Sequence, residues 1–387
     1  MPQTRPNPSV PVRGSAGEVA VVFLKLGLLA YGGMAGLVAM MRREIVERRR
    51  WVGDQEFLDL FGICNLIPGP TAAEMSIALG YERAGWPALI LGGVCFILPA
   101  VLMVLALAWA YVRYGTLPTA QWIFYGAYPV VIAIIADALW SLGRAAVKNA
   151  WLAALVVATI ALYFRGVPIV AILFGAALLA GAVGAAMNRH KAMPAIALPL
   201  LGAAAGASAA APFSMLRLFL TFMKIGAVSY GSGYALVAFL RADFVDRLHW
   251  LTNQQLLDSI AIAQITPGPV FAAATFIGYL KGGVAGALIS TLGIFLPSFA
   301  FIAIVFPLIP KLKKSALARV VLNGLNAATV GLMAAVSWQL ARGAILDIFT
   351  AVEAVVAFAI LLRFKLNSAW LILGGMALGV AAKLAMR

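Results

Sequence analysis

The chain has 387 residues, of which 63% are hydrophobic and 11% are charged, and its formal net charge is +15. Soluble domains carry about 25% charged residues, so this composition excludes an ordinary soluble protein. The basic residues are concentrated in short segments between long uncharged runs, which is typical of loops beside the cytoplasmic leaflet of a membrane. We therefore expect a multi-pass protein surrounded by a lipid bilayer, and we expect no nucleic acid as a partner.

Cysteine and histidine are too scarce for most metal and redox chemistry. The chain has two cysteines, Cys64 and Cys95, and two histidines, His190 and His249. These residues cannot supply a zinc site, a catalytic Cys/His pair or a haem motif. A membrane enzyme would also need a nucleophile or paired acids, and none converge in the sequence. We therefore predict no metal, no cofactor and no enzymatic activity.

The first half begins with a polar, proline-rich segment, residues 1–17, and continues as a membrane repeat over 18–187. An apolar helix containing Lys25 breaks at Tyr31-Gly32-Gly33, and a charged loop then ends at Trp51. The remaining predicted helices are two short ones that flank Pro68-Gly69-Pro70 and four long spans, at about 55–66, 71–82, 86–112, 119–142, 149–164 and 167–187.

The second half, 213–387, follows a linker at 188–212 and repeats the same order. With a shift of 199, FLKLGLLAYGG at 23–33 aligns with FMKIGAVSYGS at 222–232, and 18 of 46 positions are identical between 25–70 and 224–269. Internal repeats of this kind are typical of transporters. The matched features are Lys224, Tyr230-Gly231-Ser232-Gly233, Trp250, Pro267-Gly268-Pro269, two short helices at 253–265 and 270–280, and spans at 284–308, 320–341, 345–362 and 367–385.

The two repeats are predicted to be inverted within an all-α, polytopic fold with discontinuous or re-entrant helices at the Pro-Gly-Pro and Tyr-Gly breaks. If each Pro-Gly-Pro unit is a hairpin that does not cross the bilayer, the first half has five crossings, namely 19–41 and the four long spans. An odd number of crossings turns the second half over. If residues 193–212 also cross, the repeats become parallel instead.

The Pro-Gly-Pro breaks predict two helix N-termini at membrane depth. Unpaired backbone groups are costly in hydrocarbon, so a break persists only where protein, water or a ligand satisfies them. Pro70 and Pro269 suit the first residue of a new helix, and the positive end of a helix dipole attracts anions. An anion could therefore contact Gly69, Pro70, Thr71, Gly268, Pro269 and Val270. The alternative is a tight bend satisfied by protein alone.

Lys25 and Lys224 lie in apolar helices, each six residues before a Tyr-Gly break. A charged lysine at membrane depth usually faces a pathway or a partner, so both lysines are candidate anion ligands. Two alternatives stay open. Each lysine could pair with a carboxylate, Asp59 or Asp258, or could lie shallow and extend its ammonium to the interface.

Several further polar and small residues are site candidates. The glycines of Tyr31-Gly32-Gly33 and Tyr230-Gly231-Ser232-Gly233 allow close approach of the backbone to a ligand, or close helix packing. Asn65 and Gln264 could donate to an oxyanion or cap the breaks. Glu74 has Ala273 as its counterpart, so it could carry a coupling proton or simply offset Lys25 or Arg83. Asp59 and Asp258 are further candidates for proton coupling.

Five motifs of the first half recur in the same order in the second half. They are AYGGMAG, RRRW, NLIPGP, LGYERAG and FILPA in the first half, and SYGSGYA, DRLHW, AQITPGP, IGYLKGG and FLPSF in the second. In these motifs the chain resembles the chromate ion transporter family in its long, two-repeat form. The resemblance implies an inverted-repeat secondary carrier of the bacterial inner membrane that exports chromate. Where relatives commonly have FGGPAAH and E-A-Q-Q, this chain has YGGMAG and TAAE, so sulfate or another oxyanion stays an alternative substrate. An anion channel is a separate alternative that the sequence leaves open. A homodimer is also left open.

Overall fold

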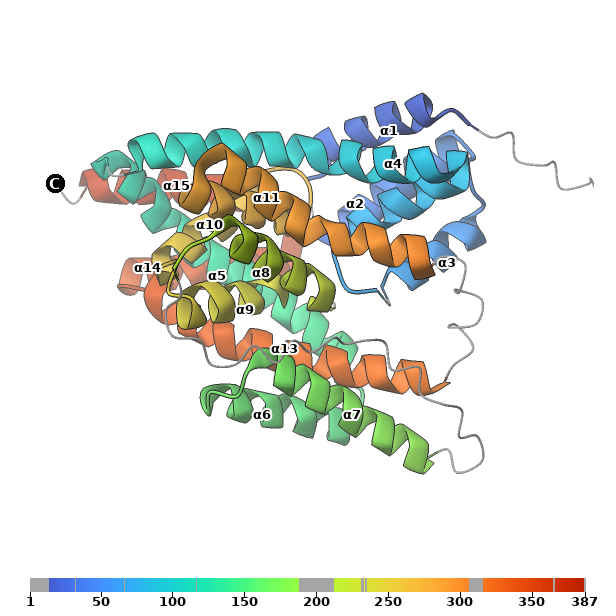
Figure 1. Ribbon diagram of the computed structural model, residues 1–387. Coiled ribbons are helices and arrows are strands. Elements are labelled where there is room, and N and C mark those ends of the chain that lie inside the picture. The colour runs from blue at the N-terminus through green and yellow to red at the C-terminus, as the bar shows by residue number, and fades with distance from the viewer. Residues whose placement is uncertain are drawn as a thin grey trace, which may run out of the picture.

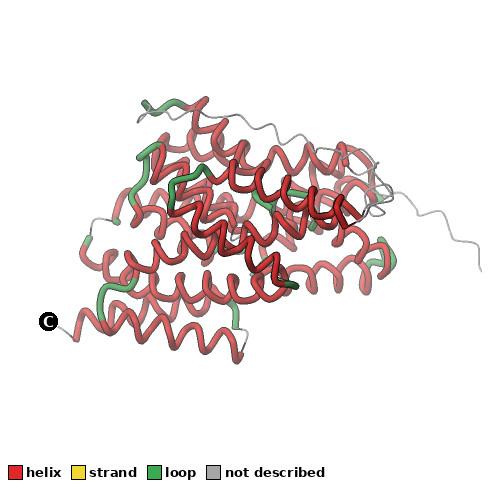
Figure 2. The backbone as a smooth tube through the Cα atoms, turned by 90° about the horizontal axis from the view of Figure 1, so that it is seen from below, coloured by secondary structure: helices red, strands yellow, loops and turns green. Residues whose placement is uncertain are grey.

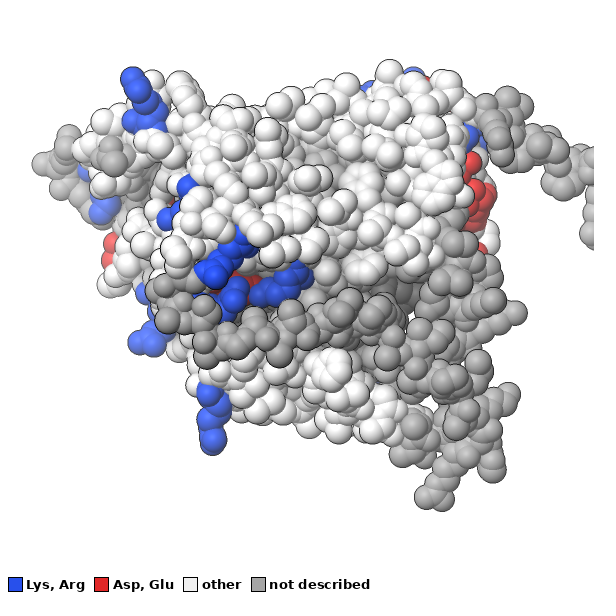
Figure 3. All heavy atoms as spheres, in the orientation of Figure 1, with Lys and Arg blue, Asp and Glu red and all other residues white. Residues whose placement is uncertain are grey.

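The computed structural model describes residues 14–31, 33–65, 67–115, 117–187, 212–230, 233, 235–305, 316–364 and 366–385, and their regular structure is helical throughout (Figures 1 and 2). Within these residues, five helices are long and apolar enough to cross a membrane, and two shorter ones are also apolar. The chain is therefore a multi-pass membrane protein. Most of the face in Figure 3 is uncharged, as expected for a surface in contact with lipid.

The helices of the two halves follow the same order. In the first half they are α1 (Ala16–Leu28), α2 (Gly33–Arg42), the π-helix η1 (Arg43–Arg48), α3 (Asp54–Cys64), α4 (Thr71–Tyr114), α5 (Pro118–Ala146), α6 (Ala150–Phe164) and α7 (Ile169–Met187). In the second half they are α8 (Met215–Val228), α9 (Ala235–Leu240), the π-helix η2 (Arg241–Arg247), α10 (Asn253–Ile265), the 3-10 turn η3 (Val270–Ala272), α11 (Ala273–Val305), α13 (Ala316–Ala344), α14 (Ile348–Phe364) and α15 (Ser368–Ala385).

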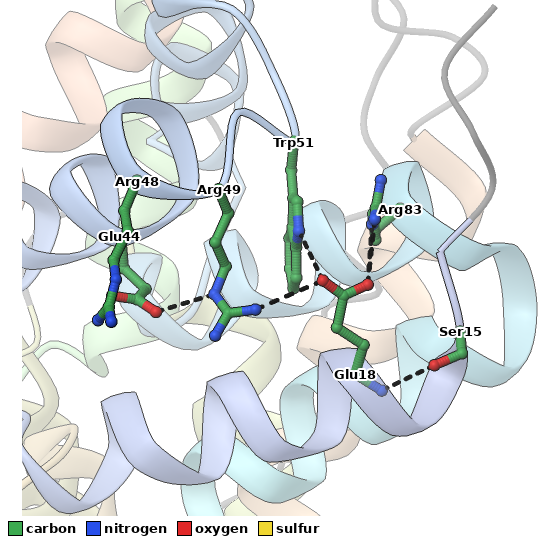
Figure 4. A network of polar contacts seen from close by, with 7 residues as sticks. All are labelled: Ser15, Glu18, Glu44, Arg48, Arg49, Trp51 and Arg83. Atoms are coloured by element: carbon green, nitrogen blue, oxygen red, sulfur yellow. Dashed lines mark hydrogen bonds and ion pairs between the residues drawn. The ribbon is translucent and has the colours of Figure 1, made fainter.

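Residues 16–48 form a hairpin whose two ends lie together. Glu18, in the first turn of α1, accepts hydrogen bonds from Trp51 Nε1 at 3.2 Å and from Arg49 at 3.4 Å, just beyond the end of η1 (Figure 4). The chain therefore turns back at the break near Tyr31. The expectation that 19–41 is a single crossing is wrong, because the Tyr-Gly break reverses the chain.

Residues 54–83 form a second hairpin that turns at Pro-Gly-Pro. Glu18 also accepts a hydrogen bond from Arg83 at 3.1 Å, so the segment that starts beyond Trp51 returns to the same place (Figure 4). At Ala84 and Gly85 the helical φ/ψ angles are interrupted, and Gly85 has a φ of 74°. The chain reverses there, which divides α4 into a first arm (71–83) and a second arm (86–114). The two arms pack against each other where Gly80 lies against Ala88.

The second half repeats both hairpins. Arg50 and the matched His249 have nearly the same left-handed φ, 52° and 53°. In α11 the reversal falls at Gly282 and Gly283 and separates a first arm (273–281) from a second arm (284–305). Ser290 Oγ on the second arm donates a 2.7 Å hydrogen bond to the carbonyl of Ala274 on the first.

The remaining helices of each half pack on the other half. Helix α5 packs against α14 and α15, and in the matching arrangement α13 packs against α6 and α7. Tyr125 of α5 donates a 2.6 Å hydrogen bond to Asp347 at the start of α14, and Tyr163 of α6 bonds Gln339 of α13 at 2.9 Å. Neither half therefore builds its core alone.

The hairpins of the two halves lie at opposite ends of the bundle. Helix α7 runs antiparallel to α13, because Ala180 near its C-terminal end packs on Gly324 near the start of α13. The first half therefore ends where α13 begins, which is also the end that holds Glu18 and α1 to α3 (Figure 1). Met215 at the start of α8 lies against Gly282, where the second arm of α11 begins. This arm ends near the start of α13, so α8 begins at the opposite end of the bundle.

Nearly all of the predicted linker, 188–212, and most of the polar segment, 1–17, lie outside the described residues. The count of five crossings in the first half is replaced by two hairpins and four long helical segments, namely the second arm of α4 with α5, α6 and α7.

Candidate functional site

The hairpin turns of the two halves meet each other. The backbone N–H of Gly69 donates to the carbonyl of Ser229 at 3.0 Å, and the N–H of Gly268 donates to the carbonyl of Ala30 at 3.0 Å. Ala30 and Ser229 are matched by the shift of 199, so the two bonds are equivalent. Each Pro-Gly-Pro break is thus joined to the Tyr-Gly break of the other half, and we call this meeting point the central junction.

The regular structure that leaves the central junction begins at Thr71 and Val270, where the predicted short helices begin, so Pro70 and Pro269 are not its first residues. Pro70 is the N-cap residue of α4 with a ψ of 99°, and its carbonyl accepts from Ala73 and Glu74. Pro269 likewise precedes η3 and, after it, α11. The proposed first helical prolines are therefore caps, because their ψ angles stay extended. Thr71 begins α4, and the first N–H groups of any helix lack partners within it.

Gly69 and Gly268 require their glycine identity. Their φ angles are 139° and 110°, values that side chains with a Cβ rarely adopt. A Cβ on Gly69 would overlap the side chains of Glu74 and Ser298, and one on Gly268 would lie 2.8 Å from the Cβ of Ala100. The backbone therefore approaches the neighbouring helices as closely as glycine allows.

Glu74 is fully buried beside Gly69. Its Oε1 accepts a long hydrogen bond of 3.4 Å from Ser298 of α11, and its Oε2 has no partner in the described part of the chain. The predicted counterpart of Glu74 in the second half is Ala273, and the counterpart of Ser298 in the first half is Ala100. The central junction is thus polar on one side and apolar on the other.

Two more buried side chains at the breaks each have one polar atom, a hydroxyl oxygen and an amide nitrogen, without a partner among the described residues. They are Ser229, whose carbonyl accepts from Gly69, and Gln264, three residues before Pro267. Buried polar groups in native proteins are nearly always paired. With Glu74 Oε2, these groups offer one acceptor, one amide donor and one hydroxyl to a polar ligand.

The other predicted break residues divide between the two halves. Asn65 is exposed and caps α3, because its Nδ2 donates to the carbonyl of Phe61 at 2.9 Å. Tyr31 is 42% exposed, whereas its match Tyr230 is buried. Thr71 is buried and Val270 is half-buried. Gly33 begins α2, Gly233 lies near Phe271, and Gly32, Gly231 and Ser232 are outside the described residues.

The lysines lie beside the π-helices. Lys224 forms an ion pair of 2.6 Å with Asp243 of η2. Asp243 also forms an ion pair of 3.0 Å with Arg247. The suggested partner Asp258 is wrong for Lys224, because its carboxylate accepts from Tyr111 at 2.6 Å and Tyr128 at 2.7 Å.

In the first half, Asp59 is exposed and accepts a hydrogen bond from Gln55. Lys25 is exposed on α1, and its charge acts on Glu44, the match of Asp243. The pKa of Glu44 is lowered mainly by the hydrogen bond from Arg49, against burial, with the charges of Arg48 and Lys25 adding to the effect. Each half therefore places a lysine near an acid in its π-helix.

Sequence reasoning missed Ser298, Glu44 and Asp243, and the tyrosine partners of Asp258. Glu44 and Asp243 carried a signal, since the shift of 199 aligns them four residues before the matched Arg48 and Arg247. The tyrosines carried none, because they reach Asp258 from helices of the other half.

A family model described as chromate transporter matches residues 17–185 and 216–380. The chain belongs to the chromate transporter family. A "Chromate transport protein" from Cupriavidus metallidurans is 36% identical over 367 residues, covering 93% of this chain and 91% of the relative. A "Probable chromate transport protein" from Synechococcus elongatus is 35% identical, covering 86% of each chain.

A third relative, "Chromate transport protein" from Pseudomonas aeruginosa, is 32% identical and covers 86% of this chain and 83% of its own. No solved structure matches the chain. These relatives in the chromate transporter family are transporters rather than enzymes, in agreement with the expectation from the sequence.

Proposed function

We propose that the chain is a secondary carrier of a tetrahedral oxyanion, chromate, and exports it across the bacterial inner membrane. The observation that carries the proposal is the central junction, in which the Gly69–Ser229 and Gly268–Ala30 bonds bring the broken segments of both halves together. Family membership supports the substrate, because the three relatives above bear chromate transport in their names.

The anion would bind beside the first turns of α4 and α11. The N-terminal N–H groups of a helix carry partial positive charge, and two such ends converge at the central junction. The N–H groups of Gly69 and Gly268 are already bonded to the opposite half, so the anion would use the groups that follow them. Ser229 and Gln264 would add side-chain donors, since both have an unpaired buried atom.

Glu74 would carry the coupling proton. A second negative charge beside a bound dianion is unfavourable, so binding of the dianion would favour the protonated carboxyl. The polar pair Glu74–Ser298 occurs on one side of the junction only, which would make the two directions of transport inequivalent.

Transport would follow alternating access between inverted repeats. The paired hairpins, which we propose to be re-entrant from opposite sides of the bilayer, would rock against the interlocked bundle of α5–α7 and α13–α15. A direct role of Lys25 and Lys224 in the site stays a prediction. For Lys224 such a contact requires exchange of its present partner, Asp243.

Uptake of labelled chromate and sulfate into proteoliposomes tests the proposal. A carrier is expected to show counterflow, in which unlabelled chromate inside accelerates uptake of labelled chromate. Uptake without counterflow would identify an anion channel, and preference for sulfate would change the substrate. Absence of oxyanion flux in protein that retains its melting temperature would refute the proposal.

A further inference from the structure

The residues that contact Glu18 in the first half have counterparts in the second half, but the central residue there has the opposite charge. Glu18 holds the ends of both hairpins through Trp51 and Arg83 (Figure 4). The shift of 199 places Arg217 at the position of Glu18 and Trp250 at that of Trp51. The shift of 198 places Lys281 at the position of Arg83. The carboxylate at the centre of the network is thus replaced by a guanidinium.

The second-half counterparts lie at one end of the bundle. The rings of Phe213 and Trp250 are 5.1 Å apart, which joins the start of α8 to the end of η2. Gly282, next to Lys281, lies against Met215, two residues before Arg217. Figure 3 shows a group of Lys and Arg side chains with an acidic side chain among them over the region of α8 and α9.

Arg217 is in an unfavourable position unless a negative group is near it. It lies in the first turn of α8, where the helix dipole favours acids and disfavours cations. Its NH1 is buried and has no partner in the described part of the chain. All 14 Asp and Glu residues of the sequence are among the described residues, and the ion pairs they form there include neither Arg217 nor Lys281.

We propose that Arg217 and Lys281 form a second anion site, away from the central junction, for a phosphate-like tetrahedral oxyanion. The anion would take the place that the Glu18 carboxylate occupies in the first half. Arg217 would donate from its unpaired NH1, and Lys281 would add a point charge. Lys224 and Arg247, which share the single carboxylate of Asp243, leave this region with an excess of positive charge. The anion could be free in solution or could be the phosphate of a lipid headgroup.

The two sources are distinguished with full-length protein in nanodiscs. One arm uses phosphatidylcholine nanodiscs and titrates inorganic phosphate, and the other compares the melting temperature in phosphatidylcholine with that in phosphatidylglycerol. In Arg217→Gln we expect phosphate binding to weaken about 10- to 150-fold, as for loss of one charge-assisted hydrogen bond, or the phosphatidylglycerol stabilisation to be lost. The first result identifies a free oxyanion and the second a lipid headgroup.

Arg342→Gln is the matched control, because Arg342 is an exposed arginine in the last turn of α13. Lys281→Gln is a second variant in case Arg217→Gln folds poorly. Arg217→Glu recreates the first-half network and is expected to melt at a higher temperature while failing to bind phosphate or respond to phosphatidylglycerol. Parental responses to both ligands in Arg217→Gln and Lys281→Gln would overturn the proposal.

Discussion

At the scale of single residues, the two halves differ at the place where they meet. Glu74 and Ser298 are in contact beside Gly69, whereas Ala100 lies beside Gly268. A buried carboxyl with one long hydrogen bond is destabilising by about 1–3 kcal/mol for each unsatisfied group. Its presence on one side of a repeated structure therefore favours a role in transport over a role in stability.

Glu74→Gln is expected to remove the pH dependence of transport and to retain anion binding, because the amide keeps the shape of the side chain and cannot release a proton. The measurement is chromate uptake into proteoliposomes with and without a pH gradient. Glu82→Gln, which changes an exposed acid on the same arm of α4, serves as the control. A Glu74→Gln variant that responds to the gradient like the parent would rule Glu74 out as the coupling group.

Gly69→Ala and Gly268→Ala are each expected to abolish transport. The added methyl group strains a positive φ and overlaps a neighbouring side chain at the junction. Gly62→Ala is the matched control, since a Cβ there meets nothing within 4 Å and alanine favours the helix. Chromate uptake and the yield of folded protein are compared. Unchanged uptake in both junction variants would show that the breaks are structural bends only.

Lys224→Ala separates an anion ligand from a paired charge. If the Lys224–Asp243 ion pair is its main role, removing the lysine leaves Asp243 with Arg247 alone and lowers the melting temperature. Lys224→Ala combined with Asp243→Ala should then recover both stability and chromate affinity. If Lys224 contacts the anion, affinity stays about 10- to 150-fold weaker in the double variant. Melting curves and chromate binding for the single and double variants decide between the two.

At the scale of elements, the hairpins depend on charged contacts at their open ends. Glu18 joins both hairpins of the first half through Trp51 and Arg83, and Glu44 holds Arg48 and Arg49 at the end of η1. These contacts are partly buried, so they are screened less than exposed ion pairs. The central junction is thus positioned from the ends of the hairpins as well as from their turns.

Stability is expected to fall in acid as Glu44 is protonated. The hydrogen bond from Arg49 lowers the pKa of Glu44 in the folded protein. The stabilisation is therefore complete above the unfolded pKa of about 4.3 and is lost as the pH falls through the lower, folded value. Glu44→Gln should lower the melting temperature at pH 7 and have a diminishing effect below about pH 4. Glu47→Gln, which alters an exposed pair, should change little at either pH.

Much of this element order could be predicted from the sequence, because proline, glycine and charged loops mark helix ends in an otherwise apolar chain. The first hairpin could not, since residues 19–41 have the length of one span and the Tyr-Gly break gives no direction to the chain beyond it. The Glu74–Ser298 contact was also out of reach, because 224 residues separate the two side chains. The asymmetry of Glu74 itself was visible in the alignment.

At the scale of the whole molecule, the matched hairpins lie at opposite ends of one bundle. The end that holds α1 to α3 also carries the basic residues around η1, namely Arg42, Arg43, Arg48, Arg49 and Arg50. Excess Lys and Arg in short loops marks the cytoplasmic side. We therefore expect this end to face the cytoplasm.

Single cysteines at Val46 and Val245 test this arrangement on a background that lacks Cys64 and Cys95. The two valines are matched, half-buried residues of η1 and η2. A membrane-impermeant thiol reagent added to intact cells should label the Val245 variant, and the Val46 variant should react only after the cells are opened. Labelling of both variants from the same side would refute the opposite placement of the two hairpin pairs.

The packing of α5 on α14 and α15 has a consequence for how the protein is made. Residues 125–135 of α5 are all buried, yet α14 begins about 200 residues after α5 ends. At about 5–20 residues per second, translation of that interval takes roughly 10–40 s. During this time lipid or the insertion machinery must cover the face of α5 that later packs against α14 and α15. Ribosomes paused before codon 348 should therefore yield a membrane-inserted but protease-sensitive first half, which becomes resistant when the last two helices arrive.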